Sequence, residues 1–365
     1  MAHVVDMVPS SPVLLAPEGL EAIVDALIGS GRDVIAPVVL DGVISLGAIT
    51  SADDLPIGWA DDQGPGTYRI EHSADHTRFR FAAPAQSWKR FLHEERTLLV
   101  RTRLVDGEIE IENRGDDQRK LAFVGIRACD LAAIQRLDVV LAADAAYQQR
   151  RAGLAMIAVA CTTAASTCFC ASMGTGPDPG PGADLVLAEL DDGMLLAAAN
   201  TDLGCRLLRA SGALEAASPE RVAEANALTE ACAASQVRAL DPDVVTQAAA
   251  HPHGEEWTKF AERCLSCGNC TMVCPTCFCT SVEDRTSITD DAAERWQRWD
   301  SCFSLDFSYI HGGSIRQSPA SRYRQWYLHK LSTWHDQFGS SGCVGCGRCI
   351  TWCPTGIDLT KAVMS

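Results

Sequence analysis

Two short apolar runs separated by a helical pattern stand out in the first half of the chain. Residues 121–126 and 156–160 each predict a buried strand, and apolar positions recur at helical spacing across residues 131–140. A strand–helix–strand order favours parallel pairing, so both strands are expected side by side in one sheet. Ligands of such sheets bind beyond the carboxyl ends of the strands, which here carry Cys129 and Cys161.

The segments around this unit predict strands before it and hairpins on both sides. Residues 38–111 are mainly strand-like, with alternation at residues 77–81 and a hairpin about Asp106-Gly107. A second hairpin is expected about Asp192-Gly193. The other expected elements are helices over residues 13–29 and most of 201–262, a loop at 127–130, and a Gly/Pro-rich loop at 174–182. The fold class is therefore α+β or α/β, with a partly parallel sheet.

Composition and charge narrow the class of protein. The 365 residues are 47% hydrophobic and 21% charged, which is typical of a folded chain. No apolar run reaches the ~18 residues needed to span a bilayer, and the proline-broken N-terminus lacks a basic signal region. We therefore expect a cytoplasmic protein whose 17 cysteines are reduced and whose partners do not include a membrane. The net charge of −16 argues against nucleic acid as a partner.

Two copies of the pattern C-x2-C-x2-C-x3-C-P, at residues 264–275 and 343–354, carry the strongest chemistry. This is the bacterial ferredoxin run, in which three cysteines bind one [4Fe–4S] cluster and the fourth binds a neighbouring cluster. Zinc sites use paired cysteines and do not require the third cysteine or the final proline. Crossed ligation predicts two [4Fe–4S] clusters, one held by Cys264, Cys267, Cys270 and Cys353, the other by Cys343, Cys346, Cys349 and Cys274.

The cysteine distribution also suggests the domain organisation. None lies in residues 1–128, whereas eleven lie between positions 264 and 353. We predict a mixed α/β domain at residues 1–250 and, after a linker at 251–254, a ferredoxin-like dicluster domain at 255–365. The 68 residues between Cys274 and Cys343 exceed those of a compact ferredoxin. Residues 281–342 are accordingly predicted to be a helical insertion, with helices at residues 291–299 and 321–338.

The insertion concentrates basic side chains in an acidic chain. Two interpretations remain open: a solvated helix face, or a docking surface for an acidic partner. The side chains are Arg295, Arg298, Arg316, Arg322, Arg324, His329 and Lys330.

A second set of cysteines, Cys129, Cys161, Cys168 and Cys170, converges on the binding edge of the predicted sheet. Four thiolates from adjacent strand-end loops suit a third [4Fe–4S] cluster, and the alternative is that these thiols are simply buried. A further alternative is that Cys129 is a nucleophile, but the sequence links no histidine to it that would act as its base. The loop at 174–182 lacks the context of a dinucleotide site, although a flavin phosphate contact stays open.

The other cysteines divide into two kinds. Cys205 and Cys232 fall on predicted helices and are interpreted as ordinary buried residues. Cys277, Cys279 and Cys302 lie near the first ferredoxin run, and Thr276-Cys-Phe-Cys279 echoes Thr167-Cys-Phe-Cys170. Those three either complete a further site or pack around the clusters, and their spacing does not distinguish between these two roles.

Taken together, several of these motifs resemble one family. The specific ones are Cys168-Phe-Cys-Ala-Ser-Met-Gly-Thr-Gly-Pro177 and Cys274-Pro-Thr-Cys-Phe-Cys279, supported by Arg127-Ala-Cys-Asp130 and Trp299-Asp-Ser-Cys302. The pattern resembles the iron–sulfur beta subunit of cytosolic sulfhydrogenases, which are NADP-linked nickel–iron hydrogenases. The corresponding iron–sulfur subunit of anaerobic sulfite reductase is similar. The resemblance covers residues from about 120 to the C-terminus, with a looser match before.

This resemblance implies an electron-transfer subunit of an oxidoreductase complex. It would join a flavin-containing NAD(P)H diaphorase subunit to the small and large subunits of a nickel–iron hydrogenase, with no catalytic residue of its own. Two alternatives remain: the corresponding subunit of an anaerobic sulfite or sulfur reductase, or a sulfur-reducing subunit in its own right. A redox-sensing regulator ranks last, because no helix–turn–helix pattern appears.

Overall fold

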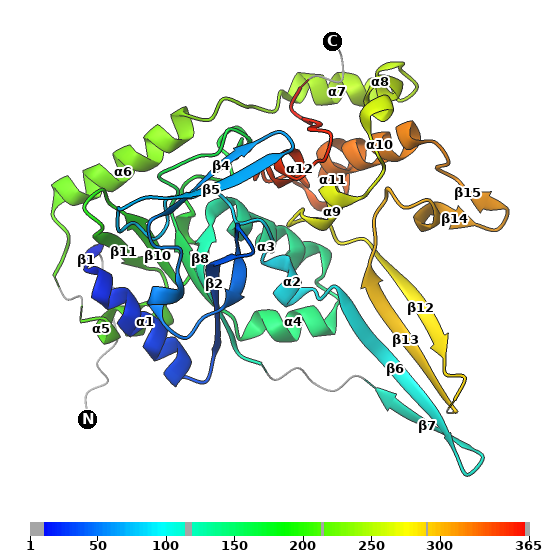
Figure 1. Cartoon of the computed structure of the whole chain (residues 1–365), viewed down its shortest axis with the longest axis horizontal. Helices are drawn as coiled ribbons and strands as arrows, with labels where there is room; N and C mark the ends of the chain where they lie inside the picture. Colours follow the sequence, from blue (N-terminus) through cyan, green and yellow to red (C-terminus); the bar gives the residue numbers. More distant parts are fainter. Residues whose placement is uncertain (1–10, 114–118, 213–214, 290, 362–365) are drawn as a thin grey trace.

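The computed structural model describes residues 11–113, 119–212, 215–289 and 291–361. Its body is built on a seven-stranded sheet of order β1-β11-β10-β9-β8-β2-β3 (Figure 1). The strands are β1 (Val13–Leu15), β2 (Asp33–Leu40), β3 (Val43–Ala48), β8 (Leu121–Arg127), β9 (Ala155–Val159), β10 (Leu185–Glu189) and β11 (Leu195–Ala199). Strands β2, β8, β9 and β10 run parallel, while the pairs at both edges are antiparallel. The partly parallel sheet predicted from the sequence is confirmed.

Helices cover both faces of this sheet because its central strands are apolar on both faces. Val124 of β8 packs in the core beneath α1 (Pro17–Gly29) and α5 (Asp202–Ala210). Phe123, the neighbouring residue, packs in a second core with α3 (Ala128–Val140) and α4 (Ala145–Ala152). The long helix α6 (Pro219–Ala234) runs along the outside of the body (Figure 1).

The loop predicted at residues 127–130 is wrong, because α3 begins at Ala128 directly after β8. Arg127 keeps an extended backbone, and Asp130 in the first turn favours helix initiation. The buried positions of the helix also extend back to Ala128 and Cys129, one turn before the apolar pattern that predicted it. Cys129 therefore sits in the first turn of a helix, still at the carboxyl end of β8.

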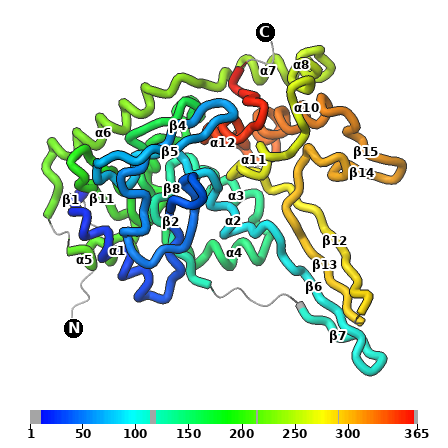
Figure 2. The backbone as a smooth tube through the Cα atoms, viewed as in Figure 1, coloured from blue at the N-terminus to red at the C-terminus, as the bar shows by residue number. Residues whose placement is uncertain are grey.

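A four-stranded antiparallel arm projects from the body (Figures 1 and 2). Its order is β12-β13-β6-β7, formed by β6 (Arg96–Val105), β7 (Glu108–Asn113), β12 (Thr280–Thr286) and β13 (Ala292–Trp299). The β6–β7 hairpin turns at Asp106-Gly107 as predicted. Because β13 pairs with β6, the N-terminal and C-terminal halves of the chain share one sheet.

Two local predictions are corrected here. Residues 291–299 were expected to be helical but form β13, because β6 supplies a pairing partner about 190 residues earlier and ion pairs such as Arg101–Glu294 join the strands. Residues 77–81 were expected to be a strand, yet they pair with no strand in the part of the chain that the structure describes. Phe79 and Phe81 are buried as the alternation implies, but their carbonyls accept hydrogen bonds from the side chain of Arg127.

The C-terminal half carries short helices around the two cysteine runs. These are α7 (Pro242–Ala250), α8 (Glu256–Arg263), α9 (Asn269–Met272), α10 (Pro319–Leu328), α11 (Trp334–Phe338) and α12 (Arg348–Thr351), with a π-helical turn at His329–Thr333. The remaining elements are α2 (Lys89–Leu92) and the hairpins β4 (Trp59–Gly64) with β5 (Thr67–His72) and β14 (Tyr309–Ile310) with β15 (Gly313–Ser314). The insertion at 281–342 is thus helical only from α10 onward, since strands form its first half. None of the helices in the described part of the chain is long and apolar enough to cross a membrane.

Candidate iron–sulfur centres

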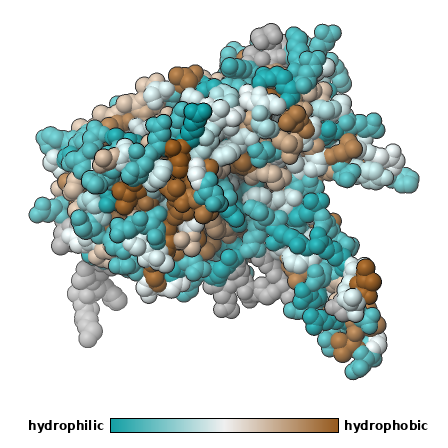
Figure 3. Space-filling view, viewed as in Figure 1, coloured by the Kyte–Doolittle hydropathy of each residue, from teal (hydrophilic) through white to brown (hydrophobic). Residues whose placement is uncertain are grey.

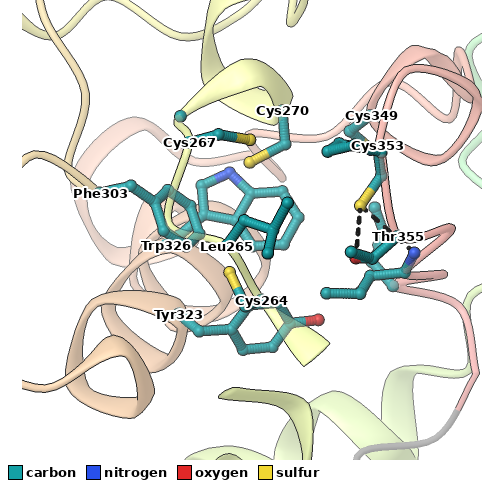
Figure 4. A pocket seen from close by; sticks show the side chains of 14 residues that line it. Cys264, Leu265, Cys267, Cys270, Phe303, Tyr323, Trp326, Cys349, Cys353 and Thr355 are labelled. Carbon is teal, nitrogen blue, oxygen red and sulfur yellow. Dashed lines mark hydrogen bonds between the residues drawn. The ribbon is translucent and has the colours of Figure 1, made fainter. Parts of the chain in front are cut away.

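Five cysteines from the two runs line one hollow, the first cage, and four of them are Cys264, Cys267, Cys270 and Cys353 (Figure 4). Cys264 and Cys267 come from the segment between α8 and α9, Cys270 lies in α9, and Cys353 follows α12. The rest of the wall is largely apolar and aromatic: Leu265, Phe303, Tyr323, Trp326, Ile357 and Leu359. The structure thus brings together the four cysteines that crossed ligation assigns to one cluster.

The second cage brings together Cys274, Cys343, Cys346 and Cys349. Three of them come from the second run, whereas Cys274 ends the first run. The cavity is closed by Phe169, Pro275, Trp326, Lys330, Val344 and Gly347. Cys349 and Trp326 also line the first cage, so the two cages are neighbours.

Backbone amides point at several of the cage sulfurs. Gly345 N donates to Cys343 Sγ at 3.4 Å, and Ile357 N donates to Cys353 Sγ at 3.3 Å. Gly345 has a φ of +64°, and a Cβ there would lie 2.6 Å from the backbone of Cys170. Such N–H···S bonds stabilise thiolates that ligate iron. Glycine is therefore required at position 345, both for the positive φ and because the loop carrying Cys170 approaches so closely.

The charges around the second cage fit an anionic group. Lys330 is 4% exposed, and its Nζ lies 3.3 Å from Cys274 Sγ. Although burial opposes its charge, the thiolates of Cys274, Cys277 and Cys343 hold the pKa of Lys330 well above its usual range. A buried ammonium needs a compensating negative charge, which a thiolate-ligated cluster provides.

Burial acts differently on thiols that have no cation beside them. It raises the pKa of Cys270 and Cys349 well above the ordinary value. Without a metal these thiols stay protonated, whereas iron coordination stabilises the thiolate. The donor set of both cages therefore fits [4Fe–4S] clusters.

The second cysteine set gathers beside the second cage. Cys129 and Cys170 pack in one buried cluster with Cys346 and Val344 of the second run. Cys168 lies close enough to Cys170 and Cys161 for their charges to raise its pKa further, after burial. This arrangement is consistent with the prediction from the sequence that these strand-end thiols lie close together.

The loop that carries Cys168 and Cys170 is fastened to the second run by hydrogen bonds. Phe169 N donates to Gly345 O at 2.9 Å, and Thr175 Oγ1 donates to Val344 O at 2.7 Å. The three thiol sites therefore follow one another through the molecule without a gap in packing: the second cysteine set, the second cage, and the first cage.

Arg127 gives the second cysteine set a buried positive charge. The side chain is fully buried, and its Nη2 donates to Phe79 O and Phe81 O at 2.7 Å each. Its Nε and Nη1 atoms have no hydrogen-bond partner among the described residues. Burial raises the pKa of the adjacent Cys161, and the charge of Arg127 opposes this rise. The charge of Arg127 beside Cys161 fits an anionic group at this site, and the buried carboxylates of Asp61 and Glu189 also lie close to the guanidinium.

An ion pair that the sequence did not indicate joins the two cysteine regions. Asp130 Oδ1 and Oδ2 accept from Arg348 Nη1 and Nη2 at 2.9 and 2.8 Å, and both side chains are 1% exposed. Asp130 follows Cys129 on α3, and Arg348 lies between two second-cage cysteines on α12. Sequence analysis noted Asp130 only as a neighbour of Cys129, because the partners are 218 positions apart.

The basic side chains of the insertion do not form one exposed surface. Arg295 and Arg298 pair with Asp284 and Glu283 on the arm. Arg322 and Lys330 are buried. The structure therefore does not support a single docking patch made of these side chains.

The leftover cysteines divide as the sequence suggested. Cys205 and Cys232 are buried on α5 and α6. Cys277, Cys279 and Cys302 line neither cage. Within the described ranges, no three His, Cys, Asp or Glu side chains are arranged to hold a single metal ion.

Comparison with known proteins agrees with this geometry. Residues 263–357 match the family model of a 4Fe-4S dicluster domain. The chain is 30% identical over 308 residues to the protein named sulfhydrogenase 2 subunit beta from Pyrococcus furiosus, an alignment that covers 81% of this chain and 88% of that protein. The chain is an iron–sulfur protein and belongs to the family of sulfhydrogenase beta subunits.

Proposed function

We propose that this chain relays electrons between a flavin subunit that oxidises NAD(P)H and a nickel–iron hydrogenase module. Membership of the beta-subunit family supports a place in a hydrogenase complex. The proposed ligands of the first cluster are Cys264, Cys267, Cys270 and Cys353, and those of the second are Cys343, Cys346, Cys349 and Cys274. A third cluster is proposed at Cys129, Cys161, Cys168 and Cys170.

The continuity of the three thiol sites carries this proposal. Cys346 packs against the second cysteine set, and Cys349 lines both cages. Each [4Fe–4S] cluster, when bound, accepts and gives up one electron at a potential set by hydrogen bonds and exposure. A row of adjoining sites suits a relay, because electrons then cross the molecule in short steps.

The residues of the chain around these sites keep the charges balanced and the spacing constant. Lys330 and Arg127 place buried positive charge beside the thiols of the second cage and of the second cysteine set. The Asp130–Arg348 pair holds α3 against α12 and so holds those two sites together. Aromatic side chains such as Tyr323 and Trp326 line the first cage.

Two surfaces suit contact with other proteins of such a complex. Cys267 is exposed, so the first cage has an edge at the surface where electrons can enter or leave. Apolar side chains gather towards the end of the arm (Figure 3), where the β6–β7 hairpin carries the exposed Leu104, Ile109 and Ile111. Exposed apolar side chains on a projecting sheet are typical of an interface between subunits.

Anaerobic spectroscopy of the reconstituted complex tests the relay. We expect NAD(P)H to bleach the cluster absorbance of this chain only when the flavin subunit is present. Hydrogen gas should bleach the same absorbance only when the nickel–iron module is present. Bleaching by NAD(P)H without the flavin subunit would contradict the proposal. Turnover of polysulfide or sulfite by the isolated chain with reduced viologen would favour a sulfur-reducing subunit instead.

A further inference from the structure

Three cysteines outside the proposed ligand sets lie around the base of the arm. Cys277 and Cys279 precede β12, and Cys302 follows β13. Thr280 pairs with Trp299 at the ends of these strands, and Asp300 N donates to Cys279 O at 2.9 Å. The antiparallel register thus brings the segments carrying Cys279 and Cys302 together, although the two residues are 23 positions apart.

Two of these thiols form a close pair. Cys279 and Cys302 are within hydrogen-bonding reach of each other, whereas Cys277 makes its contact with Cys274 of the second cage. Two thiols in contact are the arrangement that forms and breaks a disulfide.

Two buried lysines surround the pair. Lys89 is 3% exposed, donates to Cys277 O at 2.8 Å and lies 3.8 Å from the ring centroid of Trp299. Lys330 contacts Cys274 and lies near enough for its charge to act on Cys279. Neither lysine forms an ion pair with a carboxylate among the described residues, so thiolates are their available counter-charges.

These charges make the two thiols unequal. The hydrogen bond from Cys302, together with the charges of Lys330 and Lys89, lowers the pKa of Cys279 to about 7, although burial opposes this. The hydrogen bond to Cys279 and burial raise the pKa of Cys302. One thiolate beside one protonated thiol is the state from which thiol–disulfide chemistry proceeds, because the thiolate is the nucleophile.

We propose that Cys279 and Cys302 are a redox-active thiol pair that stores two electrons beside the iron–sulfur cages. Oxidation forms one Cys279–Cys302 sulfur–sulfur bond from the Cys279 thiolate and the Cys302 thiol, and it releases two electrons and the one proton of Cys302. Clusters held by the two cages would accept one electron each, and they would return these electrons in the reverse reaction. The pair would thereby couple two-electron chemistry to one-electron carriers.

The position of the pair fits this coupling, which rests on the relay proposed above. Cys302 packs in the same apolar cluster as Cys270 of the first cage. Cys279 lies beside Cys277, which contacts Cys274 of the second cage. Cys302 therefore lies near the first cage, and Cys277 links Cys279 to the second cage, so clusters held by both cages would be available to exchange one electron each with the pair.

Thiol trapping on the full, cluster-loaded chain tests the proposal without any partner. The protein is equilibrated anaerobically in buffers of oxidised and reduced dithiothreitol, alkylated with N-ethylmaleimide, digested and analysed by mass spectrometry. We expect a Cys279–Cys302 disulfide at the oxidising end and two alkylated cysteines at the reducing end, with a two-electron Nernst curve between them. Alkylation of both cysteines at every ratio would overturn the proposal.

Variants separate a thiol pair from a further cluster site. Cys302→Ser should keep the wild-type iron content and take up two fewer electrons per chain in a reductive titration. Cys205→Ser, which removes a buried helical thiol far from the pair in sequence, should match the wild type in both measurements. Loss of iron from Cys302→Ser would overturn the proposal by making Cys302 a cluster ligand. Failure of the relay would appear separately, as normal thiol trapping with no bleaching by NAD(P)H in the complex.

Discussion

Breaking the Asp130–Arg348 ion pair should destabilise the chain strongly, because the buried guanidinium of Arg348 then loses its carboxylate and keeps only the carbonyls of Pro84 and Gln86 as hydrogen-bond partners. Both side chains are 1% exposed and form two hydrogen bonds of 2.8–2.9 Å, so solvent screens neither charge. Removing one partner of such a buried pair costs about 3–5 kcal/mol. We expect Asp130→Ala to lose stability in this range and to loosen α3 from α12.

The expected shift in melting temperature follows from the size of the chain. An unfolding entropy of about 2.1 cal/mol/K per residue amounts to roughly 0.8 kcal/mol/K for the 365 residues. Asp130→Ala should therefore lower Tm by about 4–6 °C, as measured anaerobically by calorimetry on cluster-loaded protein. The Asp130→Ala/Arg348→Met double variant should recover most of this loss, because it leaves no buried charge unpaired.

A surface pair serves as the matched control. Asp284 and Arg295 form an ion pair on the arm with both side chains more than half exposed, so Asp284→Ala should have the same Tm as the wild type. A large contribution of the buried ion pair to stability is refuted if Asp130→Ala also has the same Tm as the wild type. It is refuted equally if the double variant is less stable than Asp130→Ala alone, since the unpaired Arg348 would then not be the cause.

Three further predictions concern the site and its surroundings. Gly345→Ala should reduce iron content and stability, because its Cβ would lie 2.6 Å from the Cys170 backbone. The control Gly339→Ala has a similar positive φ but open space around its Cβ, so it should retain its iron. Equal iron loss in both variants would contradict the packing argument. Arg127→Leu should lower the midpoint potential of one EPR-detected cluster, since removing a buried positive charge disfavours the reduced form, and an unchanged set of potentials would show that Arg127 faces no cluster. Burial and Lys89 lower the pKa of His93 to about 4, so the unfolded chain takes up the proton first as the pH falls. The free energy of unfolding should therefore fall by about 2 kcal/mol between pH 7 and 5. His93→Gln should flatten this decline in urea titrations, and an unchanged slope would assign the decline to another group.

Local patterns predicted those parts of the fold whose partners lie nearby. The unit β8–α3–β9 follows from the apolar runs because it is closed by a single helix, and the hairpin at Asp106-Gly107 follows from its turn. Residues 291–299 were mispredicted because β13 depends on β6, which no local pattern reveals. For residues 77–81 the alternation correctly indicated buried phenylalanines, but their hydrogen-bond partner is the side chain of Arg127.

The same distinction holds for the site. Cysteine spacing was sufficient to predict the grouping of thiols in the two cages, because the ferredoxin run is a local motif. Arg127 and Lys330 could not be predicted as buried charges beside thiols, since burial depends on the whole fold. Likewise, the contact between Cys279 and Cys302 depends on the register of β12 with β13, which the sequence alone did not reveal.

Counting iron in the anaerobically purified chain, with EPR quantification of the reduced clusters, tests the central claim most directly. Three [4Fe–4S] clusters require about 12 irons per wild-type chain, and the Cys129→Ala/Cys168→Ala variant should keep about eight with the signals of the two cages intact. Cys205→Ala should match the wild type. A wild-type chain with about eight irons, or an unchanged count in the double variant, would contradict the three-site relay.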